Sequence, residues 1–485
     1  MNRQIRRVAV FVLALFFLMF SAPFYWQVIQ SDKLANDPRN ARKLFKEYSL
    51  ERGKMVLSDG QPVAISVATD DKLKFQRSYP QGPHYGMITG FYSLVFGSSL
   101  AESAFNTYLV GKAPEQFAQN LVDLFTAEST PGGTLRLTID PNTQTIAERE
   151  LGQRKGAVVA LDYKTGKVLA MTTFPRFDPN QLSSHDSDKI RANWNRLLKD
   201  PDQPLLNRAT DALYPPGSTF KVVTAAAALE DGIGTNQPLP SPDAYTPPKT
   251  TRQIRNFGGS SCSSSKQLIM PDALAISCNT TFAALGNRVG PTKLSDEAEK
   301  FGLNEKSPYQ LRAATSSIPR EMDPPATAQS AIGQRDVRVS PLQMAMVAAT
   351  IANGGERMAP HVVDRVIDNR GKLVKQFDDE SLGQAIPGSV ADDVKQMMGA
   401  VVERGTGNFA KIDGVQVFGK TGTAQNAEGA APHAWFIGFA EQGDRSIAVA
   451  VVVENGGDLG SEATGGHVAA PVAKEVLQAY LRAGQ

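Results

Sequence analysis

From residue 215 the chain reads Pro215-Pro216-Gly217-Ser218-Thr219-Phe220-Lys221, and an alanine-rich run follows up to Glu230. The prolines and the glycine indicate a turn, and the alanines predict a helix over 218–230. Ser218 and Lys221 are three positions apart, so they share one face of that helix. A serine hydroxyl needs a base to become a nucleophile, and a lysine shielded from water can serve as that base. The segment therefore predicts a nucleophile, Ser218, with its base, Lys221.

A second motif, Lys420-Thr421-Gly422-Thr423, ends a run of residues from Val415 that is typical of a strand. Lys420 would place a positive charge beside the cleft. Gly422 would let a substrate backbone lie close to the strand. Thr421 and Thr423 offer hydroxyl groups to a carboxylate.

A third motif, Ser277-Cys278-Asn279, lies between the other two along the chain. Ser277 can pass on a proton, and Asn279 can bind an amide through both its donor and its acceptor. Taken alone, the triplet is explained equally well as a helix cap. Together the three motifs predict four catalytic residues, Ser218, Lys221, Ser277 and Lys420, and four substrate-binding residues, Asn279, Thr421, Gly422 and Thr423.

Other patterns in the chain are weaker. Ser263 and Lys266 repeat the serine–lysine spacing, but in a serine-rich loop without a proline lead-in, so we expect Ser218 to be the nucleophile. The sequence has neither a Gly-x-Ser-x-Gly elbow nor a phosphate-binding Gly-x-x-x-x-Gly-Lys loop. The five histidines are scattered, so we expect no metal and no cofactor. The 51 Lys and Arg balance 49 Asp and Glu, which gives no electrostatic case for binding nucleic acid.

The N-terminus predicts a membrane anchor. Three arginines in the first seven residues precede an apolar run over 8–29, which as a helix would be roughly 30 Å long, about one bilayer core. The arginines predict a cytoplasmic N-terminus, with the rest of the chain outside the plasma membrane. The alternative is a cleaved signal peptide, whose best cleavage site, Ala22, has the bulky Phe20 before it and Pro23 after it.

We expect three parts: the cytoplasmic N-terminus and transmembrane anchor (1–29), a non-catalytic pedestal or interaction domain (30–150), and a catalytic domain (151–485). The third part has strand patterns near its two ends, over 157–173 and 415–454, around a helical middle. This order predicts an α+β domain with a largely antiparallel sheet flanked by helices. The pedestal carries no catalytic motif, and we expect an elongated α+β structure there.

The chain has two cysteines, Cys262 and Cys278. Outside the membrane they can form a disulfide, because the serine- and glycine-rich loop over 258–265 can bring them together. The alternative is two separate thiols, one of them buried. Both readings stay open at this stage.

The ordered set of motifs resembles that of the class B penicillin-binding proteins, and the chain looks most like the short actinobacterial penicillin-binding protein A type. Other segments share this resemblance: Arg52-Gly53, Ser99–Gly111, Gly156–Met171, Tyr214–Lys221, Gly333-Gln334, Gly405-Thr406-Gly407 and His433–Phe439. The likeness therefore covers nearly the whole chain. It implies a penicilloyl-serine transferase fold and a peptidoglycan D,D-transpeptidase.

By this resemblance, Ser218 attacks the carbonyl between the two D-alanines of a stem peptide, and Lys221 takes its proton. The backbone N–H groups of Ser218 and Thr423 hold the oxyanion, and Ser277 passes a proton to the leaving D-alanine. An amine of a neighbouring stem then forms the crosslink, whereas β-lactam antibiotics acylate Ser218 and stay bound. The remaining motif residues orient the substrate (Asn279) and hold its terminal carboxylate (Lys420, Thr421 and Thr423).

The resemblance also implies partners and leaves alternatives. The segment 30–150 is too short for a glycosyltransferase module, which implies a polytopic membrane glycosyltransferase and other wall-synthesis or division proteins as partners. A role in cell division and septal wall synthesis is implied over one in elongation. The same motifs serve a D,D-carboxypeptidase or a β-lactamase-type hydrolase, and a non-enzymatic penicillin sensor or division scaffold can keep the fold. The cysteine at position 278 departs from the family pattern but leaves Ser277 and Asn279 in place.

Overall fold

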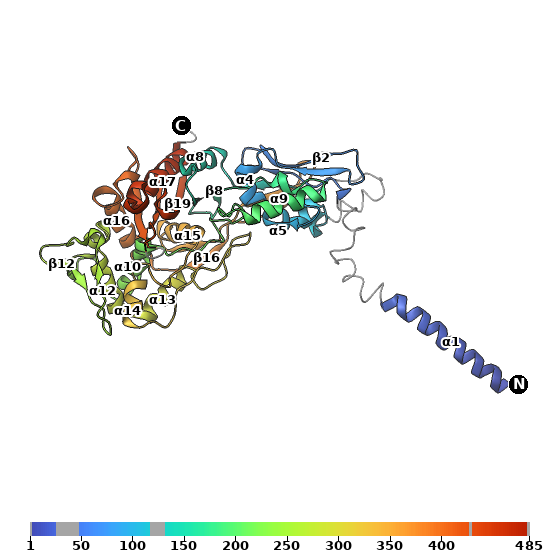
Figure 1. Ribbon diagram of the computed structural model, residues 1–485, viewed down its shortest axis with the longest axis horizontal. Helices are drawn as coiled ribbons and strands as arrows, with labels where there is room; N and C mark the ends of the chain where they lie inside the picture. The colour runs from blue at the N-terminus through green and yellow to red at the C-terminus, as the bar shows by residue number, and fades with distance from the viewer. Residues whose placement is uncertain (1, 26–47, 117–130, 426–428, 483–485) are drawn as a thin grey trace.

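The computed structural model describes residues 2–25, 48–116, 131–425 and 429–482. Its first helix, α1 (Asn2–Phe24), contains a 19-residue apolar stretch with no buried residues, which is long enough to cross a membrane. This helix fits the predicted single-pass anchor. Residues 26–29 of that prediction lie outside the described residues. Beyond the anchor, a pedestal and a larger catalytic body lie side by side along the long axis of the molecule (Figure 1).

The catalytic body is built on a five-stranded antiparallel sheet in the order β17-β18-β19-β7-β8. The strands are β7 (Gly156–Leu161), β8 (Val168–Phe174), β17 (Val417–Ala424), β18 (His433–Gln442) and β19 (Arg445–Val453). The first two strands and the last three are far apart in the chain and meet where β19 pairs with β7. The predicted antiparallel sheet is therefore confirmed.

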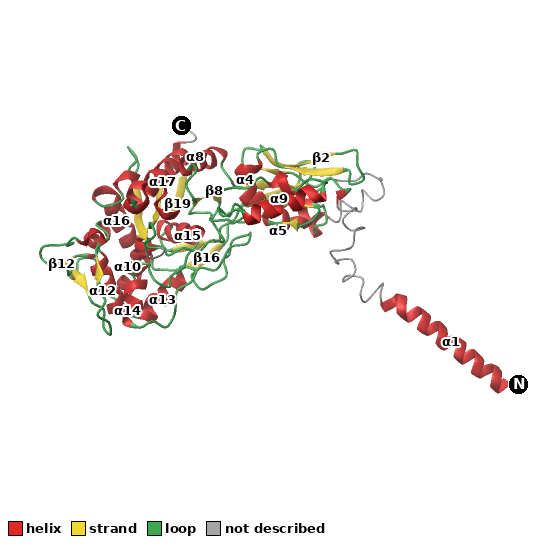
Figure 2. Cartoon of the chain, in the orientation of Figure 1, coloured by secondary structure: helices red, strands yellow, loops and turns green. Residues whose placement is uncertain are grey.

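Helices cover both faces of this sheet, because its buried strands alternate their side chains between two cores. Val158 packs with α8 (Pro141–Leu151) and α17 (Gly465–Arg482) on one face. Its neighbour Val159 packs on the other face, where α15 (Pro341–Ala352) crosses the sheet. Figure 2 shows this layered arrangement of helices around the strands. The α+β penicilloyl-serine transferase fold follows the prediction.

A helical part beside the sheet supplies most of the cleft. Its helices are α10 (Lys221–Glu230), α11 (Met270–Ala275), α12 (Asn279–Val289), α13 (Pro291–Lys300), α14 (Pro324–Ser330) and α16 (Gly388–Arg404). Short 3-10 turns lie between other elements of the chain: η3 (Pro179–Leu182), η4 (Gly217–Phe220), η5 (Phe257–Gly259), η6 (Asn408–Ala410) and η7 (Glu454–Glu462). Small two-stranded sheets accompany these helices: β9 (Leu239–Pro240) with β12 (Gln267–Leu268), β10 (Ala244–Tyr245) with β11 (Ile254–Arg255), and β13 (Glu356–Met358) with β16 (Ser381–Gln384).

The pedestal contains a six-stranded sheet in the order β15-β14-β6-β1-β2-β3. Four strands come from the N-terminal segment, β1 (Met55–Val56), β2 (Pro62–Ala68), β3 (Phe75–Ser78) and β6 (Thr134–Leu137), and two come from far along the chain, β14 (Val363–Ile367) and β15 (Leu373–Gln376). The other pedestal elements are α4 (Gly82–Thr89), β4 (Tyr92–Ser93), β5 (Gly97–Ser98), α5 (Leu100–Ala104), α6 (Asn106–Leu109) and η2 (Pro114–Gln116). Helix α9 (Ser187–Lys199) lies over the pedestal (Figure 1). The domain boundaries at 29/30 and 150/151 remain predictions. The pedestal sheet contains strands from both sides of the predicted boundary at 150/151.

A buried ion cluster holds the pedestal together. The carboxylate of Glu102 is fully buried and accepts from Arg52 Nε at 2.5 Å and from Arg77 Nε at 2.6 Å. Tyr79 donates its hydroxyl to the same carboxylate. The two arginines hold the pKa of Glu102 below its ordinary value against the effect of burial. Because each charge is paired and hydrogen-bonded, we assign the cluster a structural role.

Candidate active site

The candidate nucleophile lies on a tight turn that two glycines make possible. Ser218 is in the short turn η4, and α10 begins at Lys221, three residues later than the helix predicted over 218–230. Gly217 has a φ of 55°, and its N–H donates to the carbonyl of Gly333 at 2.8 Å. A Cβ on Gly333 would lie 2.0 Å from the carbonyl oxygen of Gly217, so only glycine fits there. The Ser218 side chain is half-buried, and its hydroxyl makes no hydrogen bond to any described residue.

An ion pair and a tyrosine hold the segment before this turn against the end of the central sheet. Tyr214 donates its hydroxyl to Glu454 at 2.7 Å, and Arg208 donates to the same carboxylate at 2.8 Å. Glu454 follows β19, so these contacts tie the segment before the nucleophile to the end of the central sheet. Sequence analysis quoted Tyr214 but gave Glu454 no role, because nothing local links residues 240 positions apart.

Lys221 is fully buried beneath the nucleophile. Its ammonium nitrogen donates to the backbone oxygen of Ser277 and to Oδ1 of Asn279, both at 2.7 Å. Burial lowers the pKa of Lys221 well below its ordinary value, and the nearby charge of Lys420 lowers it further. The Ser277 hydroxyl is a third neighbour of this nitrogen, at 3.4 Å. The lowered pKa favours the neutral amine, which can take up a proton.

Ser277 occupies a break between two helices. Helix α11 ends at Ala275 and α12 begins at Asn279, with Ser277 at a φ of 60° between them. This left-handed conformation costs a non-glycine residue about 1 kcal/mol. The Ser277 hydroxyl accepts from Lys420 at 2.9 Å and lies 3.4 Å from the nitrogen of Lys221. The strained turn thus places one hydroxyl between two buried lysines.

The helix-cap explanation of the triplet does not hold in the structure. Cys278 is at the cap position of α12 and makes no capping hydrogen bond. Instead, Oδ1 of Asn256 accepts from the N–H groups of Asn279 at 2.9 Å and Thr280 at 3.1 Å. The cap therefore comes from a loop more than twenty residues away, and Ser277 is left to contact the lysines.

Lys420 is also fully buried, and burial lowers its pKa to about 7. Besides the Ser277 hydroxyl, it donates to the carbonyl of Thr421 at 2.9 Å. The Thr421 hydroxyl is 2.6 Å from the hydroxyl of Thr406, which follows α16. Sequence analysis gave Thr406 no place in the site. The Lys420–Thr423 strand is thereby fixed on its cleft side by a residue from a neighbouring helix.

A cleft of about 710 Å³ connects these groups. Six of its lining residues are ones we predicted or their neighbours in the motifs: Ser218, Ser277, Cys278, Asn279, Thr421 and Thr423. Gly422 lies on the same strand with 2.9 Å between a Cβ built on it and the carbonyl oxygen of Pro216. The turn before the nucleophile therefore packs directly on the strand. Five of the eight predicted residues line the cleft, and the other three adjoin them: Lys221 and Lys420 contact the Ser277 hydroxyl from the buried side, and Gly422 lies between Thr421 and Thr423 on the strand.

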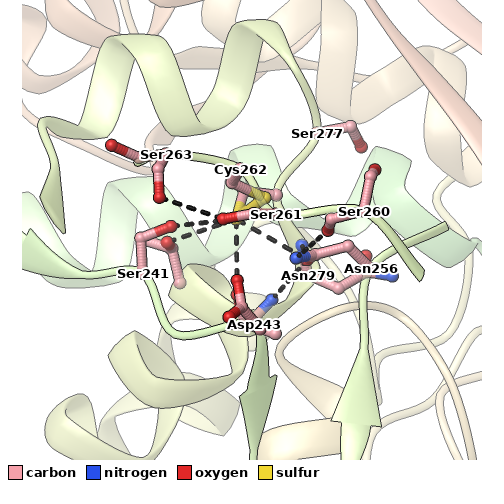
Figure 3. Close-up of a disulfide and its surroundings, with 12 residues drawn as sticks. Ser241, Asp243, Asn256, Ser260, Ser261, Cys262, Ser263, Ser277 and Asn279 are labelled. Carbon is pink, nitrogen blue, oxygen red and sulfur yellow. Dashed lines mark hydrogen bonds between the residues drawn. A yellow bond between two sulfur atoms is a disulfide. The ribbon is translucent and has the colours of Figure 1, made fainter. Parts of the chain in front are cut away.

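Cys262 and Cys278 are joined in a disulfide, with their Cα atoms 6.0 Å apart. Figure 3 shows this bond close to Ser277 and Asn279, with Ser260 and Ser261 of the adjoining loop next to them. The nearby amide of Asn256 donates to the carbonyl of Ser260 at 3.1 Å. One wall of the cleft is therefore tied covalently to the Ser277–Asn279 turn.

The second serine–lysine pair forms no site. The amine of Lys266 is exposed and pairs with Asp243 at 2.6 Å, and the Ser263 hydroxyl contacts that of Ser265 at 2.8 Å. Neither residue lines the cleft. Among the described residues, no group of histidines, cysteines and carboxylates has the arrangement of a metal site.

Comparison with known proteins identifies the class. Residues 156–478, more than half of the chain, match the family described as penicillin binding protein transpeptidase domain, and residues 52–135 match the penicillin binding protein A dimerisation domain. The chain therefore belongs to the class B penicillin-binding proteins, which are serine transpeptidases.

Two relatives and one solved structure match this chain over most of its length. The chain is 41% identical to the peptidoglycan D,D-transpeptidase PbpA of Mycolicibacterium smegmatis over 100% of both proteins, and 39% identical to that of Mycobacterium tuberculosis over 99% of both. The solved structure of penicillin-binding protein A from M. tuberculosis as a penicillin G acyl-enzyme complex matches with a TM-score of 0.84 at 38% identity. The match covers 90% of this chain and 100% of that one. The resemblance drawn from the motifs is confirmed.

Proposed function

We propose that this protein crosslinks peptidoglycan stem peptides through an acyl-enzyme on Ser218. The observation that carries the proposal is the arrangement at the cleft: two buried lysines, Lys221 and Lys420, contact the hydroxyl of Ser277, and Ser218 lines the same cleft with a hydroxyl that bonds to no described residue. Such a group of perturbed residues in a cleft is typical of a catalytic centre. The names of the relatives, peptidoglycan D,D-transpeptidases, support the same substrate class.

Acylation follows from the protonation states that burial favours. Neutral Lys221 takes the proton of Ser218 as the serine oxygen attacks the carbonyl between the two D-alanines. The chain Lys221, Ser277, Lys420 then offers a path by which a proton reaches the nitrogen of the leaving D-alanine. Proton transfer by positioned groups of this kind accelerates a reaction by roughly 10²- to 10⁴-fold.

Two further groups of contacts bind the donor peptide. Gly217 packs on the strand so closely that a Cβ there would lie 2.9 Å from the carbonyl oxygen of Thr423, which places the N–H groups of Ser218 and Thr423 on touching segments. We assign them the oxyanion, where one lost donor costs roughly 3–4 kcal/mol of barrier. The charge of Lys420 and the hydroxyls of Thr421 and Thr423 hold the terminal carboxylate. The amide of Asn279 orients the peptide, and β-lactams acylate Ser218 in place of the substrate.

The anchor and the pedestal suggest where the enzyme works. The arginines before the apolar stretch of α1 favour a cytoplasmic N-terminus and a catalytic body outside the plasma membrane. The pedestal then stands between membrane and active site, where a polytopic glycosyltransferase and other wall-synthesis or division proteins can bind it. We propose septal wall synthesis during cell division as its setting.

A fluorescent penicillin tests the central proposal. The full-length protein in detergent is incubated with the probe, next to the variants Ser218→Ala and Ser263→Ala. We expect a stable label on the wild type and on Ser263→Ala, and none on Ser218→Ala with an unchanged unfolding midpoint. A label that survives in Ser218→Ala would refute the nucleophile assignment. A folded wild type that turns the probe over without a stable label would instead indicate a hydrolase, and one that ignores it would indicate a scaffold.

A further inference from the structure

The cleft has one lining feature that the proposed acylation step does not use. Among the described residues that line it, His467 carries the one imidazole ring. His467 is exposed and lies in the first turn of α17. Its Nδ1 is 2.8 Å from the hydroxyl of Thr464, and its Nε2 has no hydrogen-bond partner among the described residues.

An exposed aromatic ring lies beside this histidine. Phe409, in η6, keeps 48% of its surface exposed, and its ring centroid is 4.9 Å from that of His467. Both residues line the cleft. An apolar ring held next to a free imidazole nitrogen offers two contacts at once: a surface for methylene groups and an acceptor for an N–H.

The position of α17 indicates which part of the substrate would contact His467 and Phe409. A Cβ on Gly465 would lie 2.5 Å from the carbonyl oxygen of Gly422, and one on Gly466 would lie 3.8 Å from Cγ2 of Thr421. The first turn of α17 therefore packs on the strand to which we assign the terminal carboxylate of the donor. His467 follows directly, on the side of the cleft where the leaving D-alanine would be bound.

The second half of the reaction needs an amine in that same place. With D-alanine as the acceptor, attack on the acyl-enzyme is the reverse of acylation, so the attacking amine must approach along the path of the leaving amine. Any other acceptor amine must reach the same point, and the chain that carries it must lie along the side of the cleft that Thr421, His467 and Phe409 line. The donor peptide, on the acyl side of the ester, does not pass there.

We propose that Thr464, His467 and Phe409 form an acceptor subsite for the amine strand, a proposal that rests on the transpeptidase function above. Thr464 accepts from Nδ1–H of His467, which leaves Nε2 to accept one N–H of the acceptor amine and to orient its lone pair towards the acyl carbon. Phe409 packs on the methylene groups next to the amine. The amine nitrogen then bonds to the acyl carbon, the bond from that carbon to Ser218 Oγ breaks, and the second amine proton returns to Ser218 through Lys221. His467 is thus a positioning residue that acts on aminolysis and not on acylation.

The partition between aminolysis and hydrolysis tests this subsite. The full-length protein is given an acyl-D-alanyl thioester donor, with D-alanine or D-norleucine as the acceptor, and the ratio of transfer product to hydrolysis product is measured. We expect His467→Gln to lower this ratio about fivefold with both acceptors, since one hydrogen bond is worth about 1 kcal/mol. Phe409→Ala should lower it for D-norleucine and leave the D-alanine ratio unchanged. Penicillin labelling should stay within about twofold of the wild type in both variants.

Leu459→Ala is the matched control, because Leu459 is also 48% exposed but does not line the cleft, and it should change none of these ratios. An unchanged ratio in His467→Gln, with normal penicillin labelling, overturns the subsite and leaves the transpeptidase proposal standing. Loss of penicillin labelling in a folded His467→Gln variant overturns the claim that His467 acts only on aminolysis. If His467→Gln fails to fold, the dependence of Phe409→Ala on acceptor chain length decides, and equal losses with both acceptors refute the proposal.

Discussion

Removal of the Ser277 hydroxyl should separate its chemical role from its backbone role. The hydroxyl accepts from buried Lys420 at 2.9 Å and lies 3.4 Å from buried Lys221, while the backbone of Ser277 has a φ of 60°. A hydrogen bond to a charged group is worth about 1.5–3 kcal/mol, and the left-handed conformation costs a non-glycine residue about 1 kcal/mol. We therefore expect Ser277→Ala to lower the free energy of unfolding by about 2 kcal/mol. Ser277→Gly, which loses the same hydroxyl but accepts the backbone, should lose about 1 kcal/mol less.

The two Ser277 substitutions should affect the rate of acylation equally, although they affect the free energy of unfolding differently. Both variants lack the hydroxyl that joins the two lysines, so both should be acylated by penicillin about 10²-fold or more slowly than the wild type, and to a similar extent. The assay pairs urea unfolding, followed by tryptophan fluorescence, with the second-order rate of labelling by a fluorescent penicillin. Wild-type labelling rates in either folded variant would refute the proton path through Ser277. A Ser277→Gly protein less stable than Ser277→Ala would refute the strain argument.

Three further predictions follow from buried groups. Burial lowers the pKa of Lys420 to about 7, so acylation by penicillin should decline as the pH rises through about 7, and a penicillin methyl ester, which lacks the carboxylate, should show a smaller decline because only the proton path through Lys420 is then affected. Burial raises the pKa of Glu297 from 4.5 to about 7. The folded protein therefore binds this proton more tightly than the unfolded chain does, and the resulting stability is complete below pH 4.5 and is lost as the pH rises to 7. Glu297→Gln should therefore be more stable than the wild type by about 3 kcal/mol at pH 8, and equal urea midpoints at pH 5 and pH 8 in the wild type would contradict this. Cys262→Ser opens the disulfide to Cys278, which closes a loop of 16 positions, and should cost about 3 kcal/mol in the same urea assay; no loss relative to a Ser263→Ala control would count against the bond.

Much of the fold could be read from local patterns. The strands at the two ends of the catalytic part appear where alternation predicted them, and the helix after the nucleophile appears where the alanines predicted it, although its α-helical part begins at Lys221. The left-handed conformation of Ser277 was not predicted. The left-handed turn has no sequence signature, since serine rather than glycine occupies it. The contacts of its hydroxyl with two distant lysines offset the strain.

The pedestal shows a second limit of sequence reasoning. Strands β14 and β15 join its sheet through the pairing of Val366 with Leu135, more than two hundred residues apart. Short alternating segments such as these predict a strand but carry no information about which sheet it joins. A division of the chain at residue 150 describes the order of the motifs, whereas the sheet is completed by residues from the other side of that division.

The sequence alone determined the three motifs, their order, the family and the apolar helix at the N-terminus, because each of these lies within a few neighbouring residues. Only the tertiary structure decided that Lys221 and Lys420 are both fully buried and share the hydroxyl of Ser277. It alone placed the cap of α12 on Asn256 and set His467 and Phe409 at the cleft. Burial and contact between distant segments depend on how the elements pack, and packing is a property of the whole chain. The residue types that carry the chemistry of the site could therefore be identified from the sequence. The burial and contacts that shift the pKa values of its two lysines could not.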